Sequence, residues 1–247
     1  SVVDANNDIK VLQGKERDEI MRILYELSAE AGDFAESIKH SYESAIRLNL
    51  IFAKAHLAYK MKATKPILNN EGITYLKKAR HPLIDPKKVV ATDIAIGDEY
   101  DTLVITGPNT GGKTVSLKTL GLLTLMVMCG MLIPVSDMSR VSVYNNILVD
   151  IGDEQSIAQS LSTFSSHMVN IMKKADDKSL ILIDELGAGT DPVEGAALAV
   201  SVIEALREKG ATIVATTHYA ELKAYALDTP GVTNGCCEFD IETLRPT

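Results

Sequence analysis

The chain has 247 residues, of which 46% are hydrophobic and 23% are charged, a balance that is ordinary for a folded globular protein. A net charge of −8 argues against a broad nucleic-acid-binding surface, because such a surface needs clustered Lys and Arg. The three cysteines have no metal-ligand spacing and make no disulfide framework, which fits a cytoplasmic protein. This length allows one large domain, or one domain with a smaller appendage.

The first quarter of the chain has a helical pattern. Residues 15–61 contain no proline and a single glycine, Gly32, and their apolar residues recur at helical spacing. The pattern predicts two or three long helices, with a stop at Gly32 and a restart at Asp33 as the N-cap residue of the next helix. Because such helices cannot form a good core alone, we expect residues 1–65 to be a helical connector.

A different pattern begins at a loop-like passage, 64–71, so a second domain is predicted over residues 66–247. Short apolar runs alternate there with helical ones, which is typical of an α/β fold with a mainly parallel sheet and helices on both faces. The predicted strands are 103–106, 147–150, 180–184 and 212–216, and the predicted helices are 112–129, 160–174 and 192–209.

One helix of this domain is apolar enough to resemble a membrane span, at residues 115–135. It carries Lys118 and two glycines, and it starts directly behind a glycine-rich loop. A helix buried inside an α/β domain explains all of these features. We therefore expect no membrane contact.

The glycine-rich loop matches the phosphate-loop pattern G-x-x-x-x-G-K-[ST] and lies between a predicted strand and a predicted helix. Its glycines let backbone N–H groups turn toward phosphate, and the helix start adds positive potential. Lys113 can reach the β- and γ-phosphates, and the Thr114 hydroxyl can ligate Mg²⁺. The predicted nucleotide-binding residues are Gly107, Pro108, Asn109, Thr110, Gly111, Gly112, Lys113, Thr114 and Val115.

Two acidic residues, Asp184 and Glu185, follow a run of four aliphatic residues. The run predicts a strand buried on both faces that delivers the two carboxylates at its carboxyl end. Asp184 would hold Mg²⁺ and Glu185 would polarise the attacking water, although two acids in a strand-ending turn are the alternative. Because nucleotide storage needs no second carboxylate, the pair favours ATP hydrolysis.

His218 lies just beyond the predicted strand 212–216. Alone it would be interpreted as a capping or core histidine. Together with the phosphate loop and the acidic pair, it is predicted to contact the γ-phosphate as a hydrogen-bond donor and sensor. Lys113, Glu185 and His218 are therefore the catalytic candidates.

Three polar segments, 150–156, 160–167 and 187–191, have no evident role within one subunit. Loop and helix-cap chemistry explains them as well as anion binding does. The residues that contact adenine are also obscure, and Val90–Asp93 is the candidate segment.

Four motifs together resemble the MutS ATPases, relatives of the ABC-type ATPases. In order, they are Thr106–Thr114, Ser162–Phe164, Asp184–Thr190 and Ala215–Tyr219. Arg80-His81-Pro82 also resembles the sequence at the start of the ATPase domain in that family. Three short sequences are similar to those of the bacterial MutS paralogue branch that carries a C-terminal Smr nuclease domain. They are Gly-Pro-Asn-Thr-Gly-Gly, Asp-Glu-Gln-Ser and Gly-Ala-Gly-Thr-Asp-Pro. The resemblance is strong over residues 72–247 and looser over the helical part.

The resemblance implies a P-loop NTPase of the ABC/MutS type that hydrolyses ATP with Mg²⁺ as a homodimer. Ser162 and Thr163 of one subunit would approach the γ-phosphate bound by the other, and the turn containing Gly189 would lie across the interface. The 1–65 segment would act as a lever. Regions expected outside this chain would encircle branched or recombining DNA, suppress homologous recombination, cut DNA, or contact stalled or collided ribosomes.

Two alternatives remain open at this stage. An ABC-type engine would typically show a Leu-Ser-Gly-Gly signature ahead of the acidic strand, where this chain has Ser162-Thr-Phe-Ser-Ser. A nucleotide-gated binding module, in which ATP fixes a shape and hydrolysis is incidental, would be compatible with the same motifs.

Overall fold

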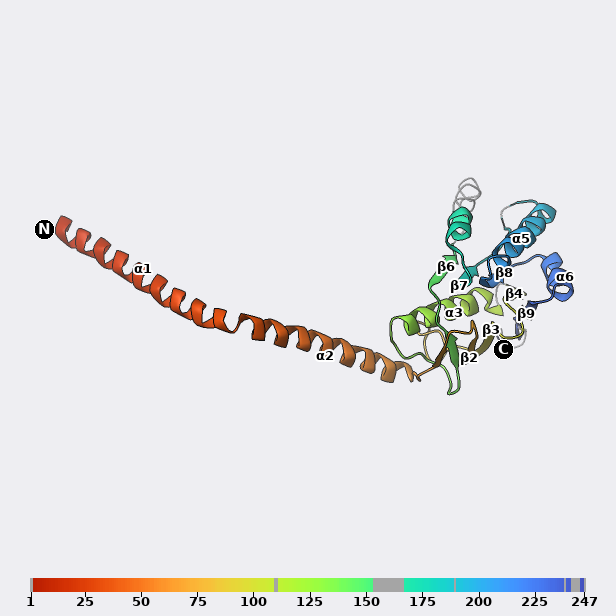
Figure 1. The fold of residues 1–247 in the computed structure, drawn as a ribbon, viewed down its shortest axis with the longest axis horizontal. Helices are drawn as coiled ribbons and strands as arrows, with labels where there is room; N and C mark the ends of the chain where they lie inside the picture. The colour runs from red at the N-terminus through yellow and green to blue at the C-terminus, as the bar shows by residue number, and fades with distance from the viewer. Residues whose placement is uncertain are drawn as a thin grey trace. The chain divides into compact units, whose positions relative to one another are not determined.

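The computed structural model describes residues 2–108, 111–152, 167–188, 190–237, 239–240 and 245–246. The chain divides into two compact units, Ser1–Ala55 and His56–Thr247. The predicted helices of the N-terminal part are present as α1 (Val2–Asp33) and α2 (Ala35–Met61), the second of which continues across the unit boundary (Figure 1). That boundary precedes the one predicted from the sequence, between residues 65 and 66.

The break between α1 and α2 lies at Phe34, and the prediction that Asp33 caps the second helix is wrong. Asp33 is the last residue of α1, and the Phe34 carbonyl accepts the first hydrogen bond of the next helix, from the Ile38 N–H at 2.9 Å. No residue of α1 is buried. Among the helices that the structure describes, none combines the length and apolarity needed to cross a bilayer.

The second unit is built around a five-stranded sheet in the order β6-β7-β8-β4-β9, in which every pairing is parallel. This confirms the predicted α/β fold with a mainly parallel sheet. The strands are β4 (Thr102–Thr106), β6 (Asn146–Asp150), β7 (Ser179–Ile183), β8 (Thr212–Thr216) and β9 (Val232–Cys236). All residues of β7 and β8 are buried, as expected for central strands that are covered on both faces.

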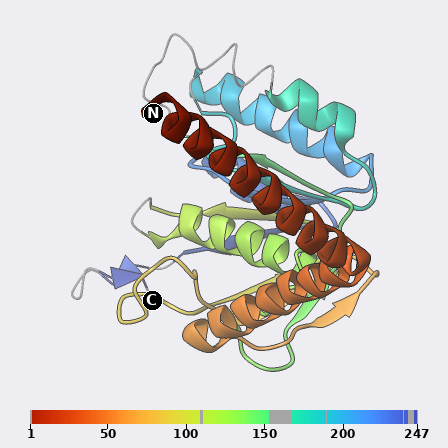
Figure 2. The same ribbon diagram turned by 90° about the vertical axis from the view of Figure 1, so that its left-hand side faces the viewer.

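Helices cover both faces of this sheet (Figure 2). The side chains of β7 point alternately to one face and to the other, and each set packs against different helices. Ile181 and Ile183 pack with α5 (Pro192–Arg207), α6 (Ala220–Asp228) and the helical residues 167–174. Leu180 and Leu182 point to the other face, against α3 (Lys113–Met128). The period of two along a strand thus divides the unit into two cores that share one sheet.

A second, smaller sheet packs on the far side of α3 and was not predicted from the sequence. Its order is β1-β5-β2-β3, with a parallel β1–β5 pair and antiparallel pairs elsewhere. Its strands are β1 (Ile67–Asn69), β2 (Thr74–Ala79), β3 (Thr92–Ile96) and β5 (Arg140–Ser142). A two-stranded antiparallel ribbon, β10 (Phe239–Asp240) with β11 (Arg245–Pro246), completes the described strands.

Candidate active site

The parallel sheet gathers the predicted site residues at one edge. Its three adjacent strands β7, β8 and β4 all end at this edge, and each is followed by one of the predicted motifs. The phosphate loop follows β4, the acidic pair follows β7, and His218 follows β8. Ligands of open α/β sheets bind outside the carboxyl ends of the strands, so the sequence motifs meet where a ligand is expected.

The phosphate loop leads directly into α3. The N-cap residue of α3 is Gly112, which has no side chain to cap the helix. The amides of the first turn are therefore suited to binding an anion. A Cβ atom at Gly111 would lie 3.0 Å from the Cβ of Cys237, because the chain beyond β9 passes very close to the loop. Glycine at this position is therefore needed for close packing as well as for phosphate access.

Lys113 is only 1% exposed although it carries a charge. Its Nζ donates a hydrogen bond to the Gly107 carbonyl and lies 3.2 Å from Nδ1 of His218. Burial lowers the pKa of Lys113, and the nearby charges of Glu185 and Asp184 oppose that shift. A desolvated ammonium at the mouth of a glycine loop is well suited to binding phosphate oxygens.

The Thr114 hydroxyl and Asp184 face each other across the site. Thr114 Oγ1 donates to Asp184 Oδ1 at 3.1 Å, and the Thr216 hydroxyl donates to the same oxygen. No cluster of three or more His, Cys, Asp or Glu side chains among the described residues could hold a metal ion. Mg²⁺ typically uses one or two protein oxygens together with substrate phosphates, and this pair of oxygens fits that requirement.

Glu185 and His218 are the other two predicted catalytic residues, and they lie side by side. His218 Nε2 is 3.6 Å from Glu185 Oε1, and both side chains are close to half exposed. The imidazole thus lies between Lys113 on one nitrogen and Glu185 on the other. An accepting Nδ1 toward the ammonium leaves the proton on Nε2, where it can be donated.

The structure describes most of the predicted site residues. Gly107, Pro108, Gly111, Gly112, Lys113, Thr114, Val115, Asp184, Glu185 and His218 lie at the sheet edge or in the loop beside it. Asn109, Thr110, Ser162, Thr163 and Gly189 lie outside the described residues, so their predicted roles stay predictions. Asp191, the last residue of the polar segment 187–191, is the N-cap residue of α5 and accepts hydrogen bonds from the Val193 and Glu194 amides.

A pocket of about 380 Å³ adjoins the phosphate loop. It contains Val90 and Thr92 of the segment predicted to contact adenine, and it also contains residues that sequence reasoning missed. Its lining residues are Ala79, His81, Ile84, Lys88, Val89, Val90, Thr92, Gly111, Gly112, Val115, Ser116, Thr119, Cys236 and Cys237. Burial raises the pKa of the Cys237 thiol and lowers that of the His81 imidazole, so both groups are biased toward their neutral forms.

Two cysteines, Cys236 and Cys237, line this pocket. Cys236 is the last residue of β9 but is exposed, whereas Cys237 follows the strand and is half-buried. No local sequence signal places them beside the phosphate loop. They lie beside the loop because β9 pairs with β4, which places Cys236 opposite Thr106.

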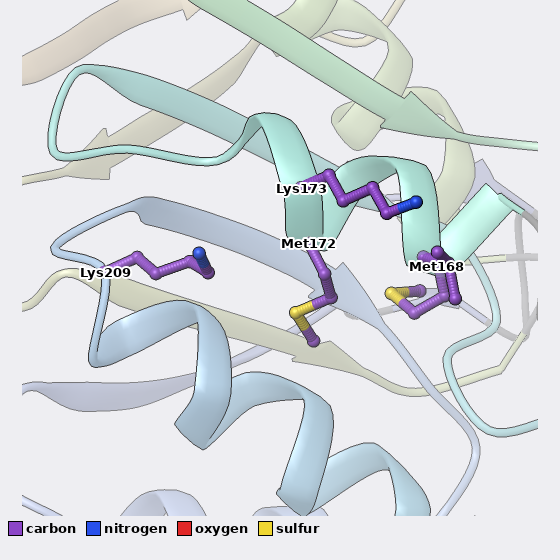
Figure 3. A pocket seen from close by; sticks show the side chains of 5 residues that line it. Met168, Met172, Lys173 and Lys209 are labelled. Carbon is purple, nitrogen blue, oxygen red and sulfur yellow. The ribbon is translucent and has the colours of Figure 1, made fainter.

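A larger groove of about 620 Å³ lies elsewhere in the unit (Figure 3). It is lined by Met168, Val169, Met172, Lys173 and Lys209. Lys209 follows α5 and shortly precedes β8, so the end of the groove that it lines is near the amino ends of the strands. It holds no carboxylate, hydroxyl or imidazole, and size alone does not make it the reactive site.

Comparisons with known proteins agree with the motifs. A family model described as MutS domain V matches residues 103–244, more than half of the chain. Over its whole length the chain is 59% identical to Endonuclease MutS2 of Caldanaerobacter subterraneus, 57% to that of Lachnospira eligens and 56% to that of Listeria monocytogenes. It spans 32% of the length of each relative. The resemblance read from the motifs is confirmed: this chain belongs to the MutS family and contains its domain V.

Proposed function

We propose that this chain hydrolyses ATP with Mg²⁺. The observation that carries the proposal is the meeting of Lys113, Asp184, Glu185 and His218 at the carboxyl edge of one parallel sheet. An ammonium for phosphate, oxygens for a metal and a carboxylate for water are the parts that phosphoryl transfer needs. Their arrangement supports hydrolysis more than storage, because Glu185 lies next to the metal ligand and is not needed to bind nucleotide.

In the proposed mechanism each residue has one task. Lys113 and the amides at the start of α3 would hold the β- and γ-phosphates, while Thr114 and Asp184 would hold Mg²⁺. Bound Mg²⁺ would neutralise charge on the phosphate oxygens. Glu185 would orient and polarise the attacking water, and His218 would donate a hydrogen bond to the γ-phosphate.

We propose further that the functional state is a homodimer with a composite site. Family membership supports this, and so do the polar segments around Ser162, Thr163 and Gly189, to which the sequence pattern assigns no catalytic role within one subunit. Residues 1–65 would then transmit domain movement as a lever. For the whole protein, the name of its relatives, Endonuclease MutS2, supports action on DNA. Branched or recombining DNA is the proposed target, and a stalled ribosome is a second one.

Phosphate release at saturating ATP tests this proposal. The rate per chain is expected to rise with protein concentration, as subunits assemble composite sites, and to vanish when EDTA removes Mg²⁺. Excess Mg²⁺ should restore it. A nucleotide-gated module would bind ATP yet release almost no phosphate at any protein concentration. A rate per chain that does not depend on protein concentration would contradict the composite site but not the hydrolase.

We infer that the pocket of about 380 Å³ beside the loop receives the adenine base. Its volume lies in the range of roughly 300–1,000 Å³ that small-molecule sites occupy, and Val89, Val90 and Ile84 give it an apolar wall. It shares Gly111 and Gly112 with the phosphate loop, so one nucleotide can span both.

Replacing Val90 with Trp is expected to weaken ATP binding about tenfold by filling this pocket, which corresponds to about 1.4 kcal/mol. Binding of inorganic triphosphate should change less than twofold, because the phosphate loop is untouched. Competition calorimetry with both ligands separates the two effects. Equal weakening of ATP and triphosphate would show that the pocket does not hold the base.

A further inference from the structure

The last residue of β8, Thr216, and the residues that follow it hold the turn that carries Glu185 through four hydrogen bonds. The Glu185 amide donates to Thr216 Oγ1 at 2.8 Å, and the Leu186 amide donates to the Thr216 carbonyl at 2.9 Å. The Thr217 hydroxyl donates back to the Leu186 carbonyl at 3.3 Å. The last of these bonds comes from Tyr219, whose hydroxyl donates to the Gly187 carbonyl at 2.8 Å.

This turn needs support because Glu185 has an unfavourable backbone conformation. Its φ of 51° is in the left-handed region, which a non-glycine residue adopts only when its surroundings require it. Gly187 follows with a φ of 85°, and the Ala188 amide closes the turn onto the Glu185 carbonyl at 3.0 Å. Any loosening of Gly187 therefore relaxes the backbone that directs the Glu185 carboxylate.

Tyr219 occupies a socket that two glycines leave open. A Cβ atom at Gly187 would lie 2.9 Å from Cε2 of Tyr219, and a Cβ atom at Gly195 would lie 2.5 Å from its hydroxyl. Gly195 is buried in the first turns of α5, so the ring is held between the turn and that helix. The hydroxyl reaches Gly187 only because both positions lack side chains.

We propose that Tyr219 is a positioning residue for hydrolysis, which fixes the Glu185–Ala188 turn so that the Glu185 carboxylate faces the attacking water. The inference rests on the proposed ATP hydrolase function. Tyr219 directly follows His218, so the residue that would contact the γ-phosphate and the residue that supports the carboxylate belong to one short segment. Tyr219 itself touches no substrate in this arrangement and acts through Glu185.

The test compares Tyr219→Phe with the parent in the full chain. Loss of one hydrogen bond to a carbonyl of the turn is expected to lower kcat about five- to tenfold while KM and the Kd for ATP change less than twofold. Tyr225→Phe is the matched control, because Tyr225 lies in α6 and donates to Glu204, away from the site. This control should keep the parent's kcat.

A double variant separates positioning from a general structural effect. In a Glu185→Gln background, Tyr219→Phe is expected to cause no further loss in single-turnover rate, because the group it positions is already gone. A parent-like kcat for Tyr219→Phe, or a loss that multiplies with that of Glu185→Gln, would overturn the positioning role and leave the hydrolase intact. Absence of any phosphate release by the parent chain would overturn both.

Discussion

Lys113→Ala is expected to abolish ATP binding, with a Kd weakened at least about hundredfold. The ammonium is 1% exposed and is desolvated before the nucleotide arrives, so it can exchange its bonds to Gly107 and His218 for charge-assisted bonds to phosphate. One or two such bonds are worth about 1.5–3 kcal/mol each, and about 2.7 kcal/mol corresponds to a factor of one hundred. Isothermal calorimetry with Mg²⁺ and ATP measures the loss directly.

Lys118→Ala is the control for this variant. Lys118 lies on the same helix, but its side chain is exposed and does not line the pocket beside the loop. Removing it changes net charge by the same amount, and its Kd for ATP should stay within about threefold of the parent, a difference of under about 0.7 kcal/mol. If Lys113→Ala retained the binding heat of the parent while remaining folded, ATP would not be held by this loop.

The arrangement of the site could be predicted from sequence because parallel strands place their ends together. Four aliphatic residues before Asp184, and the short run before Gly107, identified β7 and β4 by pattern alone. Once both strands belong to one parallel sheet, the residues that follow them must meet at one edge. Only the distances, such as 3.1 Å from Thr114 to Asp184, needed the structure.

The small sheet could not be predicted, because its strands are short or irregular. β1 and β5 have three residues each, too few to show a period of two. β2 has a register irregularity near Lys78, whose φ is 49°, and two exposed lysines interrupt its alternation. Its buried residues, such as Leu76, make sense only against α3, which is distant in the sequence.

Two further features near the site could not be predicted either, because no local sequence pattern indicates them. α6 has nine residues, and Tyr219 at its N-cap makes no side-chain capping bond, so no start signal is present. The approach of Cys237 to Gly111 depends on β9 lying beside β4, a pairing of segments about 130 residues apart. Long-range register of this kind is a property of the packed sheet and is not encoded in any short window.

Glu185→Gln is expected to lower the single-turnover rate of hydrolysis by about two to four powers of ten while ATP still binds. The amide keeps the shape of the side chain and leaves the phosphate loop and Asp184 untouched, but it cannot accept a proton from the attacking water. Loss of one negative charge near the γ-phosphate should also leave ATP affinity equal or slightly higher. A variant that binds without hydrolysing should then accumulate in the ATP-bound dimer, visible by size-exclusion chromatography with ATP.

The control for this effect is Glu208→Gln, which removes the same charge from an exposed position at the end of α5. Its turnover should match the parent, so that a loss confined to Glu185→Gln reports on the site and not on net charge. Parent-like turnover by Glu185→Gln would mean that another group activates the water. In that case neither the left-handed backbone at Glu185 nor the four hydrogen bonds that hold its turn would serve hydrolysis. The inference that Tyr219 positions Glu185 would then fail as well. Because both predictions depend on the same carboxylate, the Glu185 variant should be measured first.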